Sequence, residues 1–232
     1  MAARGPGWVV FGAGGHARAV VDVIERSGGR VVAVSGLAAP GAWHVECLED
    51  DLQALERVHA DSLRAVVAIG ANPARLNLVR AIAADGGRVP SVIAVTATVS
   101  LRSRLGEGTV VLEHAHVGPA TTVGAGVIVN TGAIVEHDCA VGDGSHVAPG
   151  ACLLGGVTIG SRTVVGSGAR ILPGVVIGAG VTVGAGAVVT TDVPDGRTVV
   201  GVPARARTAE RTTTSTTQHT TQHTVQPRGA SR

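Results

Sequence analysis

A six-residue repeat covers almost half of the chain and restricts its fold more than any other feature. Between residues 93 and 194 the sequence divides into 17 consecutive hexads, from IAVTAT to VTTDVP, without an insertion. The first residue of every hexad is Ile, Val or Leu, and the fifth is Ala, Ser, Thr, Val or Cys. Two inward positions per hexad fill only a narrow interior, so successive coils must stack and share one core. The pattern therefore predicts a regular solenoid of stacked coils.

The composition agrees with such an interior and excludes one class of partner. The chain has 34 Gly but no Tyr, one Phe and two Trp, so its core must consist of thin layers of Val, Ile, Leu and Ala. Glycine, which is most often the second residue of a hexad, permits the tight corners between flat faces. Nineteen basic residues against 17 acidic ones leave a net charge of +2. This balance provides no basic stripe for nucleic acid.

Cysteine usage and hydropathy bear on the compartment. The three cysteines are scattered at positions 47, 139 and 152, which predicts neither a disulfide framework nor a zinc ribbon and favours a reducing compartment. No signal peptide is evident before Gly12. Residues 171–191 carry no charge and could span a bilayer by length, but they keep the glycine-containing hexad pattern. We therefore expect a cytoplasmic protein with no membrane segment.

The first ninety residues have a different pattern, typical of a small α/β domain. Residues 8–11 (WVVF), 31–34 (VVAV) and 65–69 (AVVAI) are candidate strands, and residues 17–26 have helical periodicity. A second helix is expected to follow, with Asn72 as its N-cap and Pro73 at its first position. We expect a Rossmann-like domain over residues 1–92.

A glycine-rich turn after the first strand points to a phosphate ligand. Gly12, Gly14 and Ala17 fit the G-x-G-x-x-G/A pattern, in which N–H groups at a helix N-terminus face phosphate. Dinucleotide enzymes place an acidic residue about 20 residues further on, whereas this chain has Ser35 and Gly36 there. The turn therefore favours a nucleotide or nucleotide sugar over NAD, and a turn without a ligand is the alternative.

Titratable residues gather within the stretch NTGAIVEHDCAVGDGSHVAPGA, residues 130–151. If one coil takes 18 residues, His137 lies beneath Gly155, and Cys152 lies above Ile134. His137 holds an outward hexad position, whereas Cys139 holds the inward fifth position and is expected to be a small core residue rather than a nucleophile.

The outward residues of this stretch suit acyl transfer. Histidine titrates near neutral pH and can act as a general base. An adjacent carboxylate, Asp138 or Glu136, can orient the imidazole of His137. The N–H group of Gly155 can stabilise a developing oxyanion. His146 lies at a coil edge.

Four segments resemble one known family. GAGGHA (12–17), VAIG (67–70), residues 130–151 and VVGVPAR (199–205) are similar to the hexapeptide-repeat sugar acyltransferases. Within that family, they resemble the NeuD-type sialic-acid O-acetyltransferases and the PglD-type UDP-amino-sugar N-acetyltransferases. The resemblance implies a left-handed parallel β-helix over residues 93–207, assembled as a homotrimer.

The resemblance also implies the site residues and the reaction. His137 is the expected base, with Asp138 raising its basicity, and His146 and Gly155 are expected at acetyl-CoA. The expected contacts of the nucleotide sugar are Gly14, Gly15, His16 and Gly70. The implied reaction is direct transfer of an acetyl group to an amine or hydroxyl of the sugar in a ternary complex, without a metal.

The sequence also raises two alternative functions and indicates the nature of the C-terminal residues. His114 and His116 form an H-x-H pair, which raises a zinc-dependent hydratase of the β-helix carbonic anhydrase type, but no histidine pair in the repeat has the five-residue separation of that family. A non-catalytic β-helix scaffold is the other alternative. Residues 208–232 are rich in Thr, Gln and His without apolar periodicity, which predicts a disordered tail.

Overall fold

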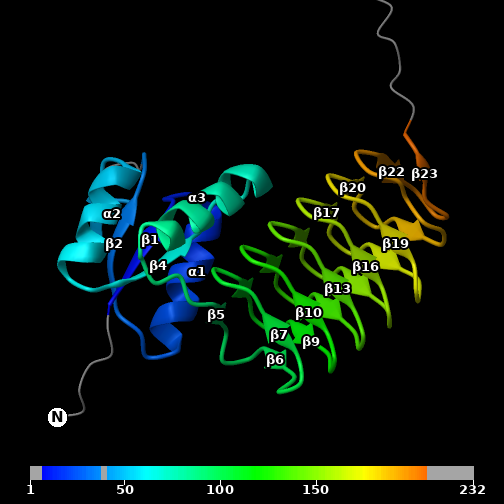
Figure 1. Ribbon diagram of the computed structural model, residues 1–232, viewed down its shortest axis with the longest axis horizontal. Coiled ribbons are helices and arrows are strands. Elements are labelled where there is room, and N and C mark those ends of the chain that lie inside the picture. The colour runs from blue at the N-terminus through cyan, green and yellow to red at the C-terminus, as the bar shows by residue number, and fades with distance from the viewer. Residues whose placement is uncertain (1–6, 38–40, 208–232) are drawn as a thin grey trace, which may run out of the picture.

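The computed structural model describes residues 7–37 and 41–207; the predicted tail lies outside these residues. Its N-terminal part is a four-stranded parallel sheet in the order β3-β2-β1-β4, with helices on both faces (Figure 1). The strands are β1 (Trp8–Phe11), β2 (Val31–Ser35), β3 (Glu46–Leu48) and β4 (Arg64–Val67). The helices are α1 (Gly15–Arg26), α2 (Asp51–Ala60) and α3 (Asn72–Ala84).

Burial explains the strands that the sequence predicts. Every residue of β1 is buried, because α1 covers one face of the sheet while α2 and α3 cover the other. A strand that is buried on both faces has a continuous apolar run. The expected α/β fold of the N-terminal part is therefore confirmed, with α1 beginning two residues before its predicted start and β4 ending at Val67 rather than at residue 69.

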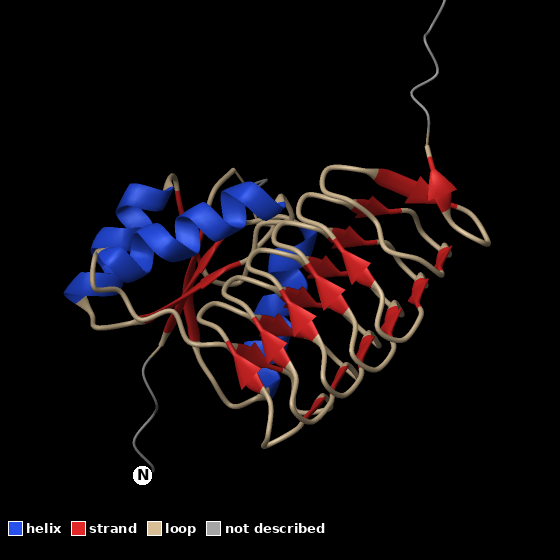
Figure 2. Cartoon of the chain, turned by 45° about the vertical axis from the view of Figure 1, so that its right-hand side comes forward, coloured by secondary structure: helices blue, strands red, loops and turns tan. Residues whose placement is uncertain are grey.

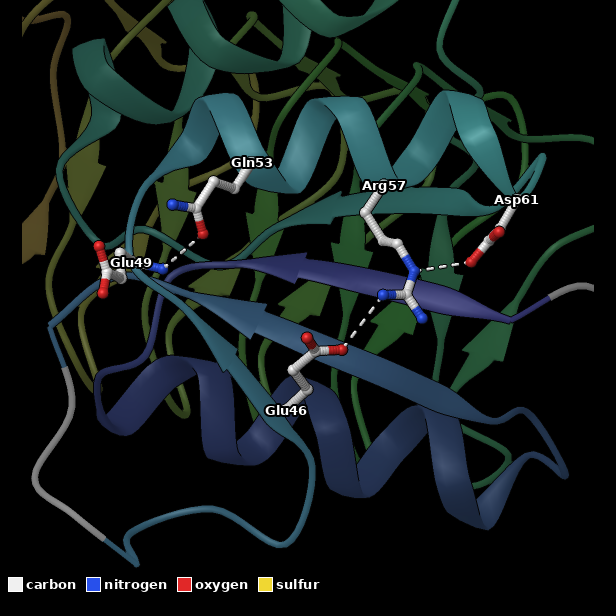
Figure 3. A network of polar contacts seen from close by, with 5 residues as sticks. All are labelled: Glu46, Glu49, Gln53, Arg57 and Asp61. Carbon is white, nitrogen blue, oxygen red and sulfur yellow. Dashed lines mark hydrogen bonds and ion pairs between the residues drawn. The ribbon is translucent and has the colours of Figure 1, made fainter.

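Helix α2 and strand β3 were not predicted from the sequence. Asp50 caps α2 by accepting a hydrogen bond from the Gln53 N–H at 2.9 Å, and the Gln53 side chain accepts one from the Glu49 N–H. Arg57 then pairs with Asp61 and with Glu46 of β3, as Figure 3 shows. The reciprocal bonds at the helix start are a variant of the capping box.

The second part is a three-sided parallel solenoid. Between residues 92 and 189 its strands are two residues long and pair with the strand 18 residues away, as Ile134 pairs with Cys152. The last parallel pair differs, because Thr182 pairs with Thr198, 16 residues later, in a strand of three residues. The first sheet contains β7 (Arg104–Leu105), β10 (Thr122–Val123), β13 (Ala140–Val141), β16 (Thr158–Ile159) and β19 (Val176–Ile177). The second contains β6 (Thr98–Val99), β9 (His116–Val117), β12 (Ile134–Val135), β15 (Cys152–Leu153), β18 (Arg170–Ile171) and β21 (Val188–Val189).

The third sheet joins the solenoid to the N-terminal part at one end. It contains β5 (Val92–Ile93), β8 (Val110–Val111), β11 (Ile128–Val129), β14 (His146–Val147), β17 (Val164–Val165), β20 (Thr182–Val183), β22 (Thr198–Val200) and β23 (Arg205–Ala206). All its pairs are parallel except β22 with β23, which closes the far end as an antiparallel pair (Figure 2). This architecture is the left-handed parallel β-helix of the hexapeptide repeat.

The interior follows the predicted hexad register. First and fifth positions such as Val135, Val141, Ala133 and Cys139 are 0–3% exposed and belong to one continuous core. Ile93 departs from the pattern, being 40% exposed, because the first coil has no coil on its other side. No helix within residues 7–37 and 41–207 has the length and apolar character to cross a membrane.

Helix α3 lies along one corner of the β-helix. Gly108, Gly126 and Gly144 occupy the same corner position in three successive coils, all with positive φ. A Cβ atom at Gly144 would lie 2.9 Å from the Cβ of Leu76, and one at Gly108 would lie 2.8 Å from a methyl group of Val79. Because these positions lack side chains, the helix packs directly against the corner backbone and joins the two parts of the chain.

Candidate active site

His137 and Asp138 form an exposed pair at the corner between β12 and β13. The Nδ1 atom of His137 lies 2.8 Å from Oδ2 of Asp138, and both side chains are more than half exposed. Since a carboxylate only accepts hydrogen bonds, Nδ1 carries the proton and Nε2 has a free lone pair. This arrangement, a carboxylate that fixes the tautomer of an imidazole, is suited to general-base catalysis.

Gly155 lies on the next coil, against the imidazole of His137. A Cβ atom at this glycine would lie 2.5 Å from Cε1 and 2.7 Å from Nε2 of the ring, so any side chain would displace His137. The neighbouring Gly156 N–H donates to the His137 carbonyl at 2.9 Å. The Gly155 N–H donates to no acceptor among the residues that the structure describes. It is therefore available to a substrate oxygen beside the imidazole.

The two cysteines of this region point away from solvent. Cys139 is 2% exposed and belongs to the β-helix core, with its thiol 3.3 Å from the Leu154 carbonyl. Burial raises the pKa of the Cys139 thiol, and it also raises the pKa of Cys152. The thiolate is the reactive form of cysteine, so neither side chain is placed or ionised to act as a nucleophile.

The glycine-rich turn lies at the carboxyl edge of the N-terminal sheet. Gly12 allows a close approach of β1 to the segment after β4, since a Cβ atom there would lie 2.8 Å from the Ala68 carbonyl oxygen. By contrast, a Cβ atom at Gly14, Gly15 or Gly70 would meet no atom within 4 Å. These three glycines therefore line open space beside the N-terminus of α1, where parallel α/β sheets bind ligands.

Asp51 supplies a carboxylate beside the turn that was not predicted from the sequence. The buried Ser35 hydroxyl, at the end of β2, donates to Oδ1 of Asp51 at 2.7 Å. The carbonyl of Ser35 accepts a hydrogen bond from the Gly12 N–H, so Ser35 connects Asp51 to the glycine-rich turn. Asp51 of α2 thus places a carboxylate at the end of β2, where the sequence has Ser35 and Gly36.

His146 is held as a neutral imidazole on the outer face of the third sheet. The Thr131 N–H donates to Oδ1 of Asn130 at 2.8 Å, which fixes the orientation of that amide. Its NH2 group therefore faces Nε2 of His146, at 2.9 Å. Because an NH2 group only donates, Nε2 of His146 is an acceptor and Nδ1 carries the proton.

His16 lies near His146, so the glycine-rich turn and the β-helix meet. Its Nε2 atom is buried and has no hydrogen-bond partner among the described residues. Burial lowers the pKa of His16 to about 4, helped by the charges of His146 and Arg75. Burial likewise lowers the pKa of His146 to about 4, with a contribution from Arg75. Both imidazoles are therefore uncharged at neutral pH.

The predicted site residues form two groups within one chain. His137, Asp138 and Gly155 lie at the corner between β12 and β13, whereas His16 and His146 lie where the N-terminal part contacts β14. The first sheet, which contains β13, lies between these groups. His114 and His116 belong to neither group, and no cluster of three or more potential metal ligands occurs among the described residues.

Comparison with known proteins identifies the family. Residues 8–82 match the PglD N-terminal domain, and residues 156–191 match the bacterial transferase hexapeptide repeat. PerB from Caulobacter crescentus, solved with CoA and GDP-perosamine, is 40% identical over 87% of this chain and 97% of that chain, with a TM-score of 0.83. The chain belongs to the PglD-type sugar acyltransferases. Among curated proteins, none matches this acyltransferase.

Two further structures resemble this acyltransferase. The acetyltransferase domain of PglB from Neisseria gonorrhoeae, solved with acetyl coenzyme A, is 35% identical over 86% of this chain and 98% of that chain, with a TM-score of 0.81. WeeI from Acinetobacter baumannii is 28% identical over 87% of this chain and 99% of that chain, with a TM-score of 0.75. The similarity thus includes both the N-terminal sheet and the β-helix.

Proposed function

We propose that this acyltransferase transfers an acetyl group from acetyl-CoA to an amino or hydroxyl group of a nucleotide-linked sugar. The observation that carries the proposal is the His137–Asp138 pair against the bare backbone of Gly155. The similar structures add support, because PerB was solved with CoA and GDP-perosamine and the PglB domain with acetyl coenzyme A. Acetyl-CoA is a metabolite of the cytoplasm, where we expect the protein to act.

In the proposed reaction, His137 acts as the general base. Its Nε2 removes a proton from the sugar amine or hydroxyl while the acceptor attacks the thioester carbonyl carbon. The Gly155 N–H stabilises the negative charge that develops on the carbonyl oxygen. The carbon–sulfur bond then breaks, and His137 returns its proton to the departing CoA thiolate. Since Cys139 and Cys152 are buried, the transfer is direct and forms no acyl-enzyme.

The proposed nucleotide site lies at the carboxyl edge of the N-terminal sheet. Gly14 and Gly15, which present open backbone at the start of α1, are assigned to the diphosphate. Gly70 and His16 line the side that faces the β-helix. Asp51 is assigned to a hydroxyl or N–H donor of the nucleoside, because Ser35 engages only one of its carboxylate oxygens.

The separation of the two residue groups supports a homotrimer. The base at the corner between β12 and β13 lies across a whole sheet from the nucleotide side of its own chain. A neighbouring chain can bring its own His137 to the surface beside His146, as in a cyclic assembly with heterologous contacts. We therefore assign each active site to two chains, with His146 and its Nδ1–H on the acetyl-CoA side.

An assay of free-thiol release tests the proposed function. The protein is incubated with acetyl-CoA and, separately, with GDP-, UDP- and dTDP-linked amino sugars, their hydroxy-sugar counterparts and free sialic acid. We expect release of CoA with at least one nucleotide-linked amino sugar, identified by mass spectrometry as the acetylated product. His137→Ala is expected to lose roughly 10²- to 10⁴-fold in kcat. A wild-type protein that acetylates none of these acceptors, or an active His137→Ala, would contradict the proposal.

A further inference from the structure

Arg75 is a charged side chain that is completely buried where the two parts of the chain meet. Its exposed fraction is 0%, and no carboxylate is among its hydrogen-bond partners. Burial lowers the pKa of Arg75 to about 10, which still leaves the guanidinium protonated at neutral pH. Burying a charge without a counter-ion is costly, and apolar side chains of similar size often serve stability better. We attribute the presence of an arginine here to the geometry of the hydrogen bonds that its guanidinium group donates.

The guanidinium group connects two segments through their backbone carbonyls. Its Nη1 donates to the carbonyls of Ile69 and Gly70, at 3.0 and 3.1 Å, in the segment that follows β4. Its Nη2 donates to the carbonyls of Gly144 and Ser145, at 2.8 and 3.2 Å, immediately before His146. The planar fork of one side chain therefore fixes the separation of the proposed nucleotide loop and the start of β14.

Additional bonds extend this connection over three coils. Nε of Arg75 donates to the Gly126 carbonyl at 2.7 Å, one coil before Gly144. Nη2 also donates to Oδ1 of Asn72, whose amide group donates to the Arg162 and Thr163 carbonyls one coil later. The sequence predicts Asn72 as the N-cap of α3, but the N-cap is Ala71. The side chain of Asn72 instead forms hydrogen bonds between the two parts of the chain.

We propose that Arg75 is a positioning residue for the acyl-transfer reaction. By holding the segment after β4 against the start of β14, it fixes the position of Gly70 and His16, on the proposed nucleotide side, relative to His146, on the proposed acetyl-CoA side. Nucleotide sugar and acetyl-CoA then meet at a fixed distance. The inference rests on the proposed function, because it assigns these two sides to the two substrates.

Three variants separate the charge of Arg75 from its hydrogen-bonding geometry. Arg75→Lys keeps the positive charge but loses the planar fork, and Arg75→Met keeps the apolar stem but loses both. Arg80→Met is the matched control, because Arg80 lies on the same helix and bridges to Asp143 of the same corner at 2.7 Å, but is 60% exposed. Each protein is examined for steady-state kinetics, for hydrogen exchange of its backbone amides and for titration of its histidines by NMR.

We expect both Arg75 variants to lose about 10²-fold in kcat/KM, since misplacement by 1 Å is enough for such a loss. Exchange of the amides in residues 69–71 and 145–147 is expected to accelerate in both. The titration of His146 and His16 is expected to move upward from about pH 4 only in Arg75→Met, because Arg75→Lys keeps the charge that lowers their pKa. Arg80→Met should match the wild type in all three measurements.

The results distinguish this inference from the proposed function. If the wild type acetylates no sugar, the proposed function fails, while the exchange and titration measurements still test the position of the two segments. If Arg75→Lys keeps wild-type kcat/KM and wild-type exchange, the positioning role is wrong. Should Arg75→Met not fold, Asn72→Ala replaces it: removing the amide that links Arg75 to the next coil is expected to accelerate exchange at residues 145–147, and unchanged exchange would contradict the inference.

Discussion

At the scale of single residues, the proposed chemistry depends on the orientation of one imidazole. Asp138 has a φ of 58°, a conformation that Asn adopts as readily as Asp. Asp138→Asn therefore keeps the backbone and the size of the side chain, but it removes the negative charge beside Nδ1 of His137. We expect kcat to fall by roughly ten- to a hundredfold with little change in KM for the sugar. Steady-state kinetics of wild type and Asp138→Asn measure this, and unchanged kcat would show that the carboxylate has no role.

Two other histidines govern how stability responds to acid. His16 and His146 titrate at a pKa of about 4 in the folded chain and near 6.5 when unfolded. Between these values the unfolded chain binds more protons, so stability falls as the pH is lowered from about 6.5 to 4. The expected loss is on the order of 3 kcal/mol for each histidine. Urea unfolding between pH 7 and 4 measures it; His16→Gln should reduce the pH dependence, and an equal dependence in that variant would contradict this account.

The hexad register predicts which residues point inward but not which distant residues meet. It places Cys139 in the core and His137 outside it beneath Gly155, and the structure has both arrangements. The contact between Asn130 and His146 depends on a side chain that runs along a sheet face, which a count of positions does not describe. The contact of Asp51 with Ser35 depends on an unpredicted helix. Position within a repeat is a local property, whereas these contacts are properties of the folded chain.

At the scale of elements, the packing of α3 depends on a match between two spacings. An α-helix rises 1.5 Å per residue, and adjacent parallel strands are about 4.8 Å apart, so three to four helical residues correspond to one coil. Asn72, Leu76 and Val79 accordingly contact successive corners of the β-helix. Gly144 has a φ of +65° and no room for a Cβ atom against Leu76, whereas Gly132 has a similar φ of +63° and open space around it.

We therefore expect Gly144→Ala to be more destabilising than Gly132→Ala. Both substitutions place alanine in a left-handed conformation, at a cost of about 1–2 kcal/mol. Only Gly144→Ala also pushes α3 away from the corner, which adds roughly 1–3 kcal/mol. The difference in urea midpoint between the two variants measures the contact with α3. Equal midpoints would mean that the helix does not constrain this corner.

The elements differ in how much of them the sequence predicts. The β-helix is predictable between residues 93 and 194, because each hexad there repeats the same inward pair. The antiparallel pair of β22 and β23 lies beyond the last hexad and was not predicted. Strands β1 and β4 are short apolar runs next to glycine and are also predictable. Helix α2 buries only Ala54 and Val58, so burial leaves little signal for it in the sequence. Its better signal is the capping pattern of Asp50 and Gln53, which specifies where the helix begins.

At the scale of the whole molecule, the arrangement of the two residue groups leads to the prediction that activity is a property of the proposed trimer. The first sheet of the β-helix separates His137 from His146 within a chain. If each site combines His137 of one chain with His146 of the next, no isolated chain has a complete site. A substitution of His137 then removes the contribution of one chain to the site, and a substitution of His146 removes the contribution of the other chain. Two inactive variants can therefore complement one another.

Complementation between His137→Ala and His146→Ala tests the shared site directly. The two variants are co-expressed with different affinity tags, and trimers that contain both are isolated and compared with each variant alone. Each isolated trimer that contains both variants has one intact site of three, so about a third of wild-type turnover is expected. If each site instead lay within one chain, every chain would carry a defect and turnover would stay at the level of the single variants. Light scattering of the same samples establishes whether the assembly is the trimer that this proportion requires.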